Sequence, residues 1–178
     1  MSKSRVLSSE LKKHIDKEVL ISGWLHKKRE LGGMTFILVR DRHGLVQVLI
    51  ENKEELKKLD GLQIGSVLTI EGKVISEERA SGGVEIHEPK ITVEVPVEFP
   101  SPIEIDKPFD HSPDNLDTLF EYKVLNMRNV TERGIWKIQA VIGDAIREYL
   151  KSKDFIEFHS PKLLAEATEG GAEVFKLD

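Results

Sequence analysis

Five short segments in the first 95 residues are rich in β-branched and aromatic residues, the composition that favours β-strands. They are residues 18–25, 35–40, 45–50, 66–75 and 84–93. The turn Asp41–Gly44 predicts a hairpin between the second and third segments, and Gly82-Gly83 marks a turn before the fifth. One short helix is predicted among them, at residues 52–59, with Asn52 as its cap. The front of the chain should therefore fold as a small, mainly β domain.

The order of these elements narrows the choice of fold. Three strands, a helix and two strands within about 80 residues is the order of the OB-fold, a five-stranded β-barrel that binds oligonucleotides or oligosaccharides. An antiparallel sandwich is the alternative, but it would need about seven strands. We therefore predict a five-stranded OB-fold β-barrel in residues 1–95, with a basic loop at residues 26–33 and an opening helix at Ser8–Asp16 that Ser8 or Ser9 caps.

The chain changes character after residue 95. Prolines remove a backbone donor and favour extended geometry before them, and five crowd the next segment: Pro96, Pro100, Pro102, Pro108 and Pro113. We interpret residues 96–130 as a hinge. Beyond it, apolar residues at helical spacing predict an amphipathic helix from a Thr131 cap to Leu150, and residues 155–158 resemble a strand that Pro161 ends.

This second part is too small to enclose a core. An apolar helix stripe needs a facing layer, which one helix and one strand do not supply. We therefore expect residues 131–178 to be the first elements of a larger α+β domain, or else a dimerisation arm. In either case we expect the chain to be a fragment.

Composition excludes several classes of protein. The sequence has no cysteine, which rules out disulfides, thiolate metal sites and cysteine nucleophiles and suits the reducing cytoplasm. No apolar run approaches the roughly 18 residues that cross a bilayer, and the first residues lack a signal-peptide core, so we expect a cytoplasmic protein without a membrane partner. The six histidines show no metal-ligand spacing, and no phosphate-cradling glycine motif or catalytic Ser/His/Asp arrangement stands out.

Charge is unevenly distributed along the chain. The first 50 residues carry ten Lys and Arg against five Asp and Glu, whereas the remainder carries sixteen against twenty-six. A basic front end on a chain of net charge −5 indicates an anionic partner that touches one end, although such charges often form only a solvated surface.

The predicted second and third strands carry the best candidates for binding. OB-fold barrels bind ligands on this face and its adjoining loops. Phe36 could stack on a nucleobase, and the amide of Gln47 could both donate to and accept from the edge of an unpaired base. The preceding run His26, Lys27, Lys28 and Arg29 would contact phosphates, and the planar fork of Arg29 suits a base edge. The alternative is that Phe36 fills the barrel core and Gln47 merely faces solvent.

Two longer stretches resemble one known family. GWLHKKRELGGMTFILVRDRHGLVQVLI (Gly23–Ile50) resembles the anticodon-binding barrel of class II (subclass b) aspartyl-tRNA synthetases of archaeal type and of their asparaginyl relatives. FIEFHSPKLLAEATEGGAEVF (Phe155–Phe175) resembles their motif 1 and the loop that closes over the amino acid. The resemblance covers nearly the whole chain and implies an anticodon-binding barrel, a hinge and the start of a class II catalytic domain.

The resemblance also implies roles for individual residues. Phe36, Gln47 and Arg29 stand where the family stacks on and reads the anticodon, with Gln47 on the middle uracil. His26 and Ser81 lie near positions that bear on whether tRNA-Asp alone or also tRNA-Asn is accepted.

Two further positions match the catalytic part of the family. Pro161 matches the motif 1 proline in the subunit interface of the homodimer. Glu169 matches the glutamate that contacts the α-ammonium of the amino acid, and the adjacent Gly170 and Gly171 allow that loop to move.

The reaction implied for the full-length family needs ATP and Mg²⁺. The aspartate carboxylate attacks the α-phosphate of ATP to give an aspartyl-adenylate and pyrophosphate, and the aspartyl group then passes to the terminal ribose of tRNA. Motifs 2 and 3, whose arginines hold ATP, do not occur in these 178 residues. We therefore expect no catalytic residue within the chain, no cofactor bound by it and no activity of the chain alone.

Three alternatives remain open at this point. The barrel favours an aspartate-tRNA ligase, but the run from Ser112 to Arg128 is closer to the asparaginyl pattern, so an asparagine-tRNA ligase is one alternative. A freestanding OB module that binds single-stranded nucleic acid is another. A structural protein that dimerises through the Thr131–Leu150 helix is the third.

Overall fold

The computed structural model describes residues 4–31, 33–80, 82–107, 109 and 113–159. The chain divides into two units, Met1–Arg133 and Gly134–Asp178. The first unit holds all the described strands, and the second holds most of one long helix.

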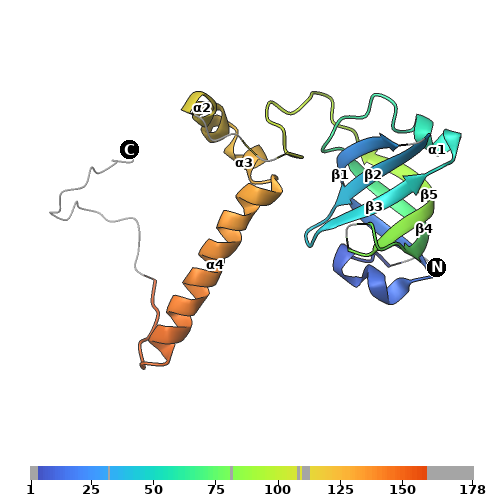
Figure 1. Cartoon of the computed structure of the whole chain (residues 1–178). Coiled ribbons are helices and arrows are strands. Elements are labelled where there is room, and N and C mark those ends of the chain that lie inside the picture. Colours follow the sequence, from blue (N-terminus) through green and yellow to red (C-terminus); the bar gives the residue numbers. More distant parts are fainter. Residues whose placement is uncertain (1–3, 32, 81, 108, 110–112, 160–178) are drawn as a thin grey trace. The chain divides into compact units, whose positions relative to one another are not determined.

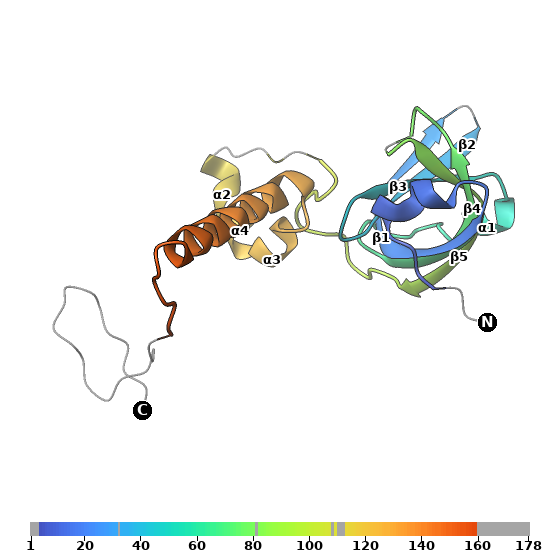
Figure 2. The same cartoon turned by 90° about the horizontal axis from the view of Figure 1, so that it is seen from below.

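Five strands close into a barrel in the first unit (Figure 1, Figure 2). They are β1 (Glu18–Leu31), β2 (Met34–Arg40), β3 (Leu45–Ile50), β4 (Val67–Ser76) and β5 (Val84–Val95). The order around the barrel is β1-β2-β3-β5-β4, and β4 pairs back with β1. All neighbours are antiparallel except β3 and β5, which are parallel. The predicted five-stranded OB-fold is confirmed.

Alternate residues of each strand fill the barrel interior, because successive side chains of a strand point to opposite faces. On β1 the side chains of Val19, Ile21 and Leu25 are buried in this core, and Gly23 holds the remaining inward place. A Cβ atom at Gly23 would lie 2.5 Å from the carbonyl oxygen of Arg40. Only glycine therefore fits where β1 passes β2 this closely.

The first strand is longer than the sequence predicts. Residues 26–31, expected as part of a basic loop, continue β1 and pair with β2. The register shifts between Leu25 and Lys27, so that His26 sits in a β-bulge and the ladder resumes beyond it. The charged residues favoured a loop, but pairing with a neighbouring strand overrides that local preference.

A 3-10 helix (Ser8–His14) stands near the predicted place before β1. Its Leu11 is buried in the barrel core. The N-cap position of this helix is occupied by Leu7. The predicted cap by Ser8 or Ser9 is therefore wrong. Ser8 instead donates from its backbone N–H and its Oγ to the carboxylate of Asp41, both at 2.6 Å. These bonds tie the helix to the turn between β2 and β3.

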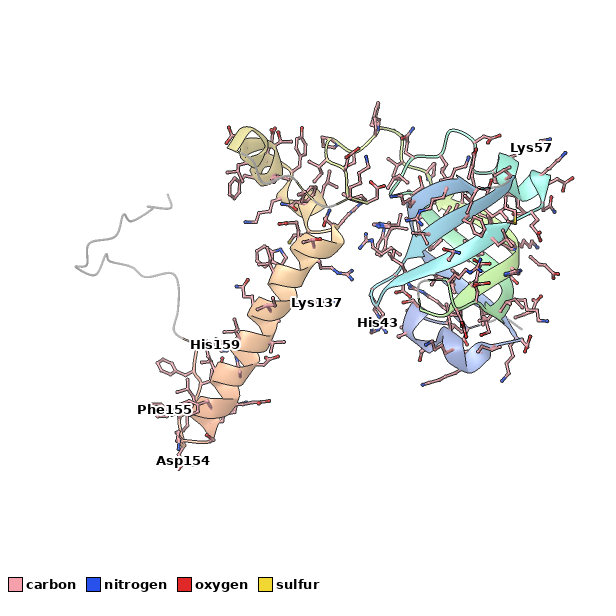
Figure 3. The ribbon with its side chains drawn as sticks, viewed as in Figure 1. His43, Lys57, Lys137, Asp154, Phe155 and His159 are labelled. Atoms are coloured by element: carbon pink, nitrogen blue, oxygen red, sulfur yellow. The ribbon has the colours of Figure 1, made fainter. Side chains whose placement is uncertain are left out.

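The short helix α1 (Lys53–Lys57) follows β3 as predicted. The side chain of Asn52 caps it, since its Oδ1 accepts the backbone N–H of Glu54 at 2.8 Å. Figure 3 labels Lys57 at the end of α1, and His43 in the turn between β2 and β3.

Two helices that the sequence analysis did not predict lie in the proline-rich part of the chain. They are α2 (Pro113–Glu121) and α3 (Lys123–Asn126). A proline is compatible with the first turn of a helix, where its missing N–H is no loss, so Pro113 does not prevent α2. Buried Ile103, Ile105 and Leu119 form a second apolar cluster. Residues 96–107 form neither helix nor strand.

The helix α4 (Val130–Lys151) confirms the predicted amphipathic helix. Asn129 caps it in place of Thr131, because Oδ1 of Asn129 accepts the backbone N–H of Thr131 at 2.9 Å. The strand predicted at residues 155–158 is not formed. A strand needs a partner for its backbone groups, and the described residues provide none there.

Candidate nucleic-acid interface

Phe36 lies on the outer face of the barrel. Its neighbours along β2, Thr35 and Ile37, are buried, whereas Phe36 is half-buried and does not belong to the core. Its ladder partners are Arg29 on β1 and Leu49 on β3. The alternative in which this ring fills the barrel core is therefore wrong. A partly exposed aromatic ring on a sheet face is suited to stacking on a base.

Gln47 shares this outer face. It lies two residues before Leu49, the ladder partner of Phe36, and alternate residues of a strand point the same way. The amide nitrogen of Gln47 donates to Oε2 of Glu85 at 2.5 Å, and Oε1 of Glu85 lies 2.8 Å from Nε2 of His87. Glu85 is only 4% exposed. The amide of Gln47 is thus held by a buried carboxylate of the neighbouring strand β5 and does not simply face solvent.

The bond to Glu85 fixes which atoms the amide offers. With one N–H on the carboxylate, Gln47 presents its carbonyl oxygen as an acceptor and its second N–H as a donor. Uracil has an N3–H donor beside a carbonyl acceptor, whereas cytosine has an acceptor at N3 beside an amino donor. For a base held in a fixed position, an amide fixed in one orientation can therefore discriminate between uracil and cytosine, because the two bases present donor and acceptor in opposite order.

Sequence reasoning missed Glu85 and His87. Both lie on β5, which follows β3 only after a helix and another strand. The parallel pairing of β3 with β5 sets Gln47 opposite Glu85. The register between β3 and β5 would have revealed that Glu85 lies beside Gln47. The residue pattern of each single strand does not contain this register.

The basic side chains on β1 differ in their surroundings. Arg29 is exposed and has no ion pair within the described residues. Nζ of Lys27 lies 3.9 Å from the carboxylate of Asp106, and Nζ of Lys28 lies 3.8 Å from that of Glu30. Partly exposed pairs of this kind contribute about 1 kcal/mol or less, so both lysines can exchange these partners for phosphate.

His26 is buried, whereas the three basic residues that follow it on β1 are partly or fully exposed. It lies in the bulge of β1, is 6% exposed, and its Nδ1 has no hydrogen-bond partner among the described residues. Burial is the main cause that holds the pKa of His26 below its ordinary value, and Arg40 lowers it further. The imidazole is therefore neutral at pH 7 and does not present a charge to phosphate.

Ser81, Pro161 and Glu169, the other predicted site residues, lie outside the described residues. Within the described ranges, no three or more His, Cys, Asp or Glu side chains form a group that could hold a metal ion. None of the described helices has the length and apolar character that a membrane span requires.

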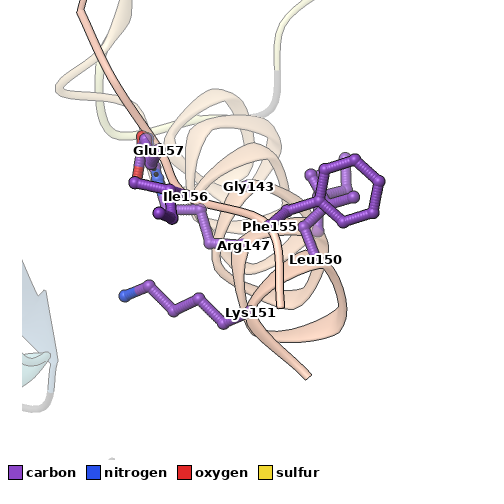
Figure 4. Close-up of a pocket in the computed structure, with 8 residues that line it drawn as sticks. Gly143, Arg147, Leu150, Lys151, Phe155, Ile156 and Glu157 are labelled. Atoms are coloured by element: carbon purple, nitrogen blue, oxygen red, sulfur yellow. Dashed lines mark hydrogen bonds and ion pairs between the residues drawn. The ribbon is translucent and has the colours of Figure 1, made fainter. Parts of the chain in front are cut away.

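A hollow lies in the second unit, beside the end of α4. It has a volume of about 360 Å³. Its lining combines apolar side chains such as Leu150 and Phe155 with Arg147, which pairs with Glu157 at 3.1 Å (Figure 4). The hollow holds no cluster of groups suited to catalysis, so the outer barrel face remains the better candidate site.

Two family models match the chain. Residues 19–94 match the OB-fold nucleic acid binding domain of the tRNA anti-codon family. Residues 115–178 match the class II tRNA synthetases (D, K and N). The first range contains all of the described candidate residues on β1, β2, β3 and β5.

Curated relatives and solved structures agree with these matches. The chain is 41% identical over 164 residues to an aspartate-tRNA(Asp/Asn) ligase of Methanopyrus kandleri, covering 90% of this chain and 37% of the relative. It is 35% identical over 178 residues to the ligase of the same name from Archaeoglobus fulgidus, covering 97% and 41%. The asparaginyl-tRNA synthetase of Pyrococcus horikoshii, solved with asparaginyl-adenylate, superposes with a TM-score of 0.81 at 32% identity, covering 100% of this chain and 41% of that one.

The chain thus spans about two fifths of the length of the relatives that it matches. The resemblance found in the sequence, the barrel and these matches agree on one assignment. The chain belongs to the class II tRNA synthetases of the aspartyl, lysyl and asparaginyl group, and its barrel is the OB-fold anticodon-binding domain of that family.

Proposed function

We propose that the chain is part of an aspartate-tRNA ligase and that its barrel recognises the anticodon of tRNA-Asp, and of tRNA-Asn as well. The observation that carries this proposal is that Phe36 and the oriented amide of Gln47 lie on the same outer face of the barrel. The names of the relatives, which are ligases for both tRNAs, support the wider tRNA choice.

In this proposal the middle uracil of the anticodon stacks on Phe36 and bonds to Gln47. Arg29 contacts a neighbouring base edge or phosphate, and Lys27 and Lys28 contact the backbone. His26 and Ser81 take part in the choice between the two tRNAs, His26 through its neutral ring in the bulge. These roles follow from the family resemblance and fit the exposure and charge of the described side chains.

The catalytic part of the proposal concerns the longer protein. Class II membership implies ATP with Mg²⁺ for the full-length enzyme, where they would supply the activated phosphate for adenylate formation. Glu169 would contact the α-ammonium of the amino acid, and the segment around Pro161 would form the interface of a homodimer in the cytoplasm. The described residues of this chain bind and orient RNA, and the chemistry takes place in the remainder of the enzyme.

The test is binding of the 178-residue chain to the anticodon stem-loop of tRNA-Asp. We expect Phe36→Ala to weaken binding by about 1 to 3 kcal/mol, the contribution of one stacked base. We expect Gln47→Ala to abolish the preference for uracil over cytosine at the middle position. Fluorescence anisotropy with the two stem-loops measures both effects.

Matched controls are available in the same chain. Phe99 is 78% exposed and lies outside β2 and β3, so Phe99→Ala should bind like the wild type. Gln63→Ala is the corresponding control for Gln47, because Gln63 is exposed in the loop before β4. Equal affinity of the wild type for stem-loops with uracil and cytosine would refute anticodon recognition. Strong binding to arbitrary oligonucleotides would instead favour a freestanding single-strand binding module.

An asparagine-tRNA ligase is the second candidate for the amino acid. The superposition on the Pyrococcus horikoshii asparaginyl enzyme favours it, whereas the names of the first relatives favour aspartate. Pyrophosphate exchange by the full-length enzyme with each amino acid decides between them. We expect exchange with aspartate and not with asparagine.

A further inference from the structure

His87 is bonded to the carboxylate that orients Gln47. Its Nε2 lies 2.8 Å from Oε1 of Glu85, while Oε2 of the same carboxylate accepts the amide nitrogen of Gln47 at 2.5 Å. An ionised carboxylate only accepts hydrogen bonds, so Nε2 of His87 carries the proton of this bond. Two hydrogen bonds thus connect the ring of His87 through Glu85 to the amide of Gln47.

The strand register brings these three side chains to the outer face of the barrel. Ile86, between Glu85 and His87 on β5, is fully buried in the barrel core, so its two neighbours point outward. Gln47 lies opposite Glu85 and likewise stands between two buried residues of β3. His87 itself is half-buried. It therefore belongs to the face that carries the candidate site.

Burial makes both hydrogen bonds of Glu85 necessary. A buried charge costs free energy unless its oxygens accept hydrogen bonds. Within the described residues, His87 and Gln47 supply the hydrogen bonds to this carboxylate. The cation that the ladder places beside His87 is Lys73 on β4, and its Nζ lies 3.7 Å from the carboxylate of Asp16 instead. His87 is therefore the second donor on which Glu85 depends.

We propose that His87 is a positioning residue: by holding one oxygen of Glu85, it keeps the other in place for Gln47 and so fixes the amide orientation that discriminates between uracil and cytosine. The terminal torsion of a glutamate side chain is broad and roughly two-fold, so a carboxylate held at one oxygen alone can turn. Gln47 can then bond to either oxygen, and its amide is no longer fixed. The inference rests on the proposed anticodon recognition and concerns a residue that acts through Glu85.

The experiment compares His87→Leu with His87→Gln in the 178-residue chain, using stem-loops with uracil or cytosine at the middle position. Leucine has no donor, whereas the amide nitrogen of glutamine can take the place of Nε2. We expect the preference for uracil to fall about tenfold in His87→Leu, the effect of losing one hydrogen bond. His87→Gln should keep the preference within about twofold of the wild type.

NMR of the free chain follows the same amide without RNA. In the wild type and in His87→Gln, we expect the side-chain NH₂ signals of Gln47 to lie away from those of Gln63, which is exposed. In His87→Leu they should move toward them. His159→Leu is the matched control, because His159 is exposed and lies outside the barrel strands, so this variant should change neither readout. Melting temperatures show that each variant is folded.

The outcomes separate the inference from the function on which it rests. A wild type that prefers uracil, with the same preference in His87→Leu, would overturn the inference and leave anticodon recognition standing. An equal loss of affinity for both stem-loops that His87→Gln does not restore would overturn it as well, because His87 would then only support the fold. Gln47 signals that shift in His87→Leu and return in His87→Gln, in a chain without a preference for uracil, would support the positioning role and refute anticodon recognition.

Discussion

Asp41 is a buried carboxylate that joins the opening 3-10 helix to the turn after β2. Besides the two bonds from Ser8, it accepts the backbone N–H groups of His43 at 2.8 Å and Gly44 at 2.9 Å. Burial alone would raise the pKa of Asp41, but the bonds from Ser8, followed by those from Gly44 and His43, outweigh it and hold the pKa below its ordinary value. The ionised form is therefore stabilised by folding.

We predict that Asp41→Asn lowers the free energy of unfolding by about 1 to 3 kcal/mol at pH 7. One carboxylate oxygen, which accepts hydrogen bonds, is replaced by an NH₂ group, which can only donate and would face the donors that this oxygen accepts from. A carboxyl whose pKa is lower in the folded state contributes its full stabilisation above the unfolded pKa, about 3.9. That contribution is lost as the pH falls through the folded value. Urea unfolding at pH 7, 5 and 3 should thus show the difference from wild type shrinking only below about pH 4. The exposed Asp60→Asn serves as control, and a difference independent of pH would contradict the explanation.

Glu85 orients the amide of Gln47, so it should govern base choice without touching the base. In Glu85→Gln the new side chain can donate as well as accept, and Gln47 can then turn its amide over. We expect the preference for uracil over cytosine to fall about tenfold, while Phe36 retains its stacking contribution. Competition between the two stem-loops measures this. A loss of affinity that is equal for both bases would show that Glu85 has only a structural role.

Among the elements, the close passage of β1 over β2 depends on Gly23. We predict that Gly23→Ala destabilises the barrel by about 1 to 3 kcal/mol, because the new methyl group would meet the backbone of Arg40 and neither strand can withdraw without breaking its ladder. Gly134→Ala is the matched control, since nothing lies within 4 Å of a Cβ there. In the interior of α4 it should add about 0.5 to 1 kcal/mol of helix stability. Thermal unfolding of both variants provides the comparison, and equal melting temperatures would refute the packing argument.

The elements also show what a sequence can and cannot reveal. The barrel strands were predictable because each carries its own apolar alternation between turn residues, and the hairpin turn fixed the register that puts Phe36 and Gln47 on one face. Residues 26–31 were missed because they are charged and become a strand only through β2. Glu85 was missed because β3 and β5 meet across intervening elements. Local sequence patterns were sufficient for single strands and for the hairpin between neighbouring strands. The features that were missed depend on pairing between segments that the local pattern does not connect.

Within the whole molecule, the two units differ in how much apolar surface they bury. The strands of the first unit enclose a continuous core. In the second unit Ile135, Ile138, Ile142 and Ile146 of α4 are each more than half exposed. A helix with so little burial depends largely on its own hydrogen bonds, and these open locally at low free energy.

We predict that amides of α4 beyond residue 134 exchange with deuterium at least about a hundredfold faster than those of the central barrel strands, when the whole chain is studied at low concentration. Hydrogen exchange with mass spectrometry at neutral pH resolves the two regions, and the same chain unfolded in denaturant sets the unprotected limit. Protection of α4 equal to that of the strands at every concentration would contradict the prediction. Protection that rises with protein concentration would show that a second copy covers the isoleucine face, because association buries surface by mass action and folding of one chain does not depend on concentration.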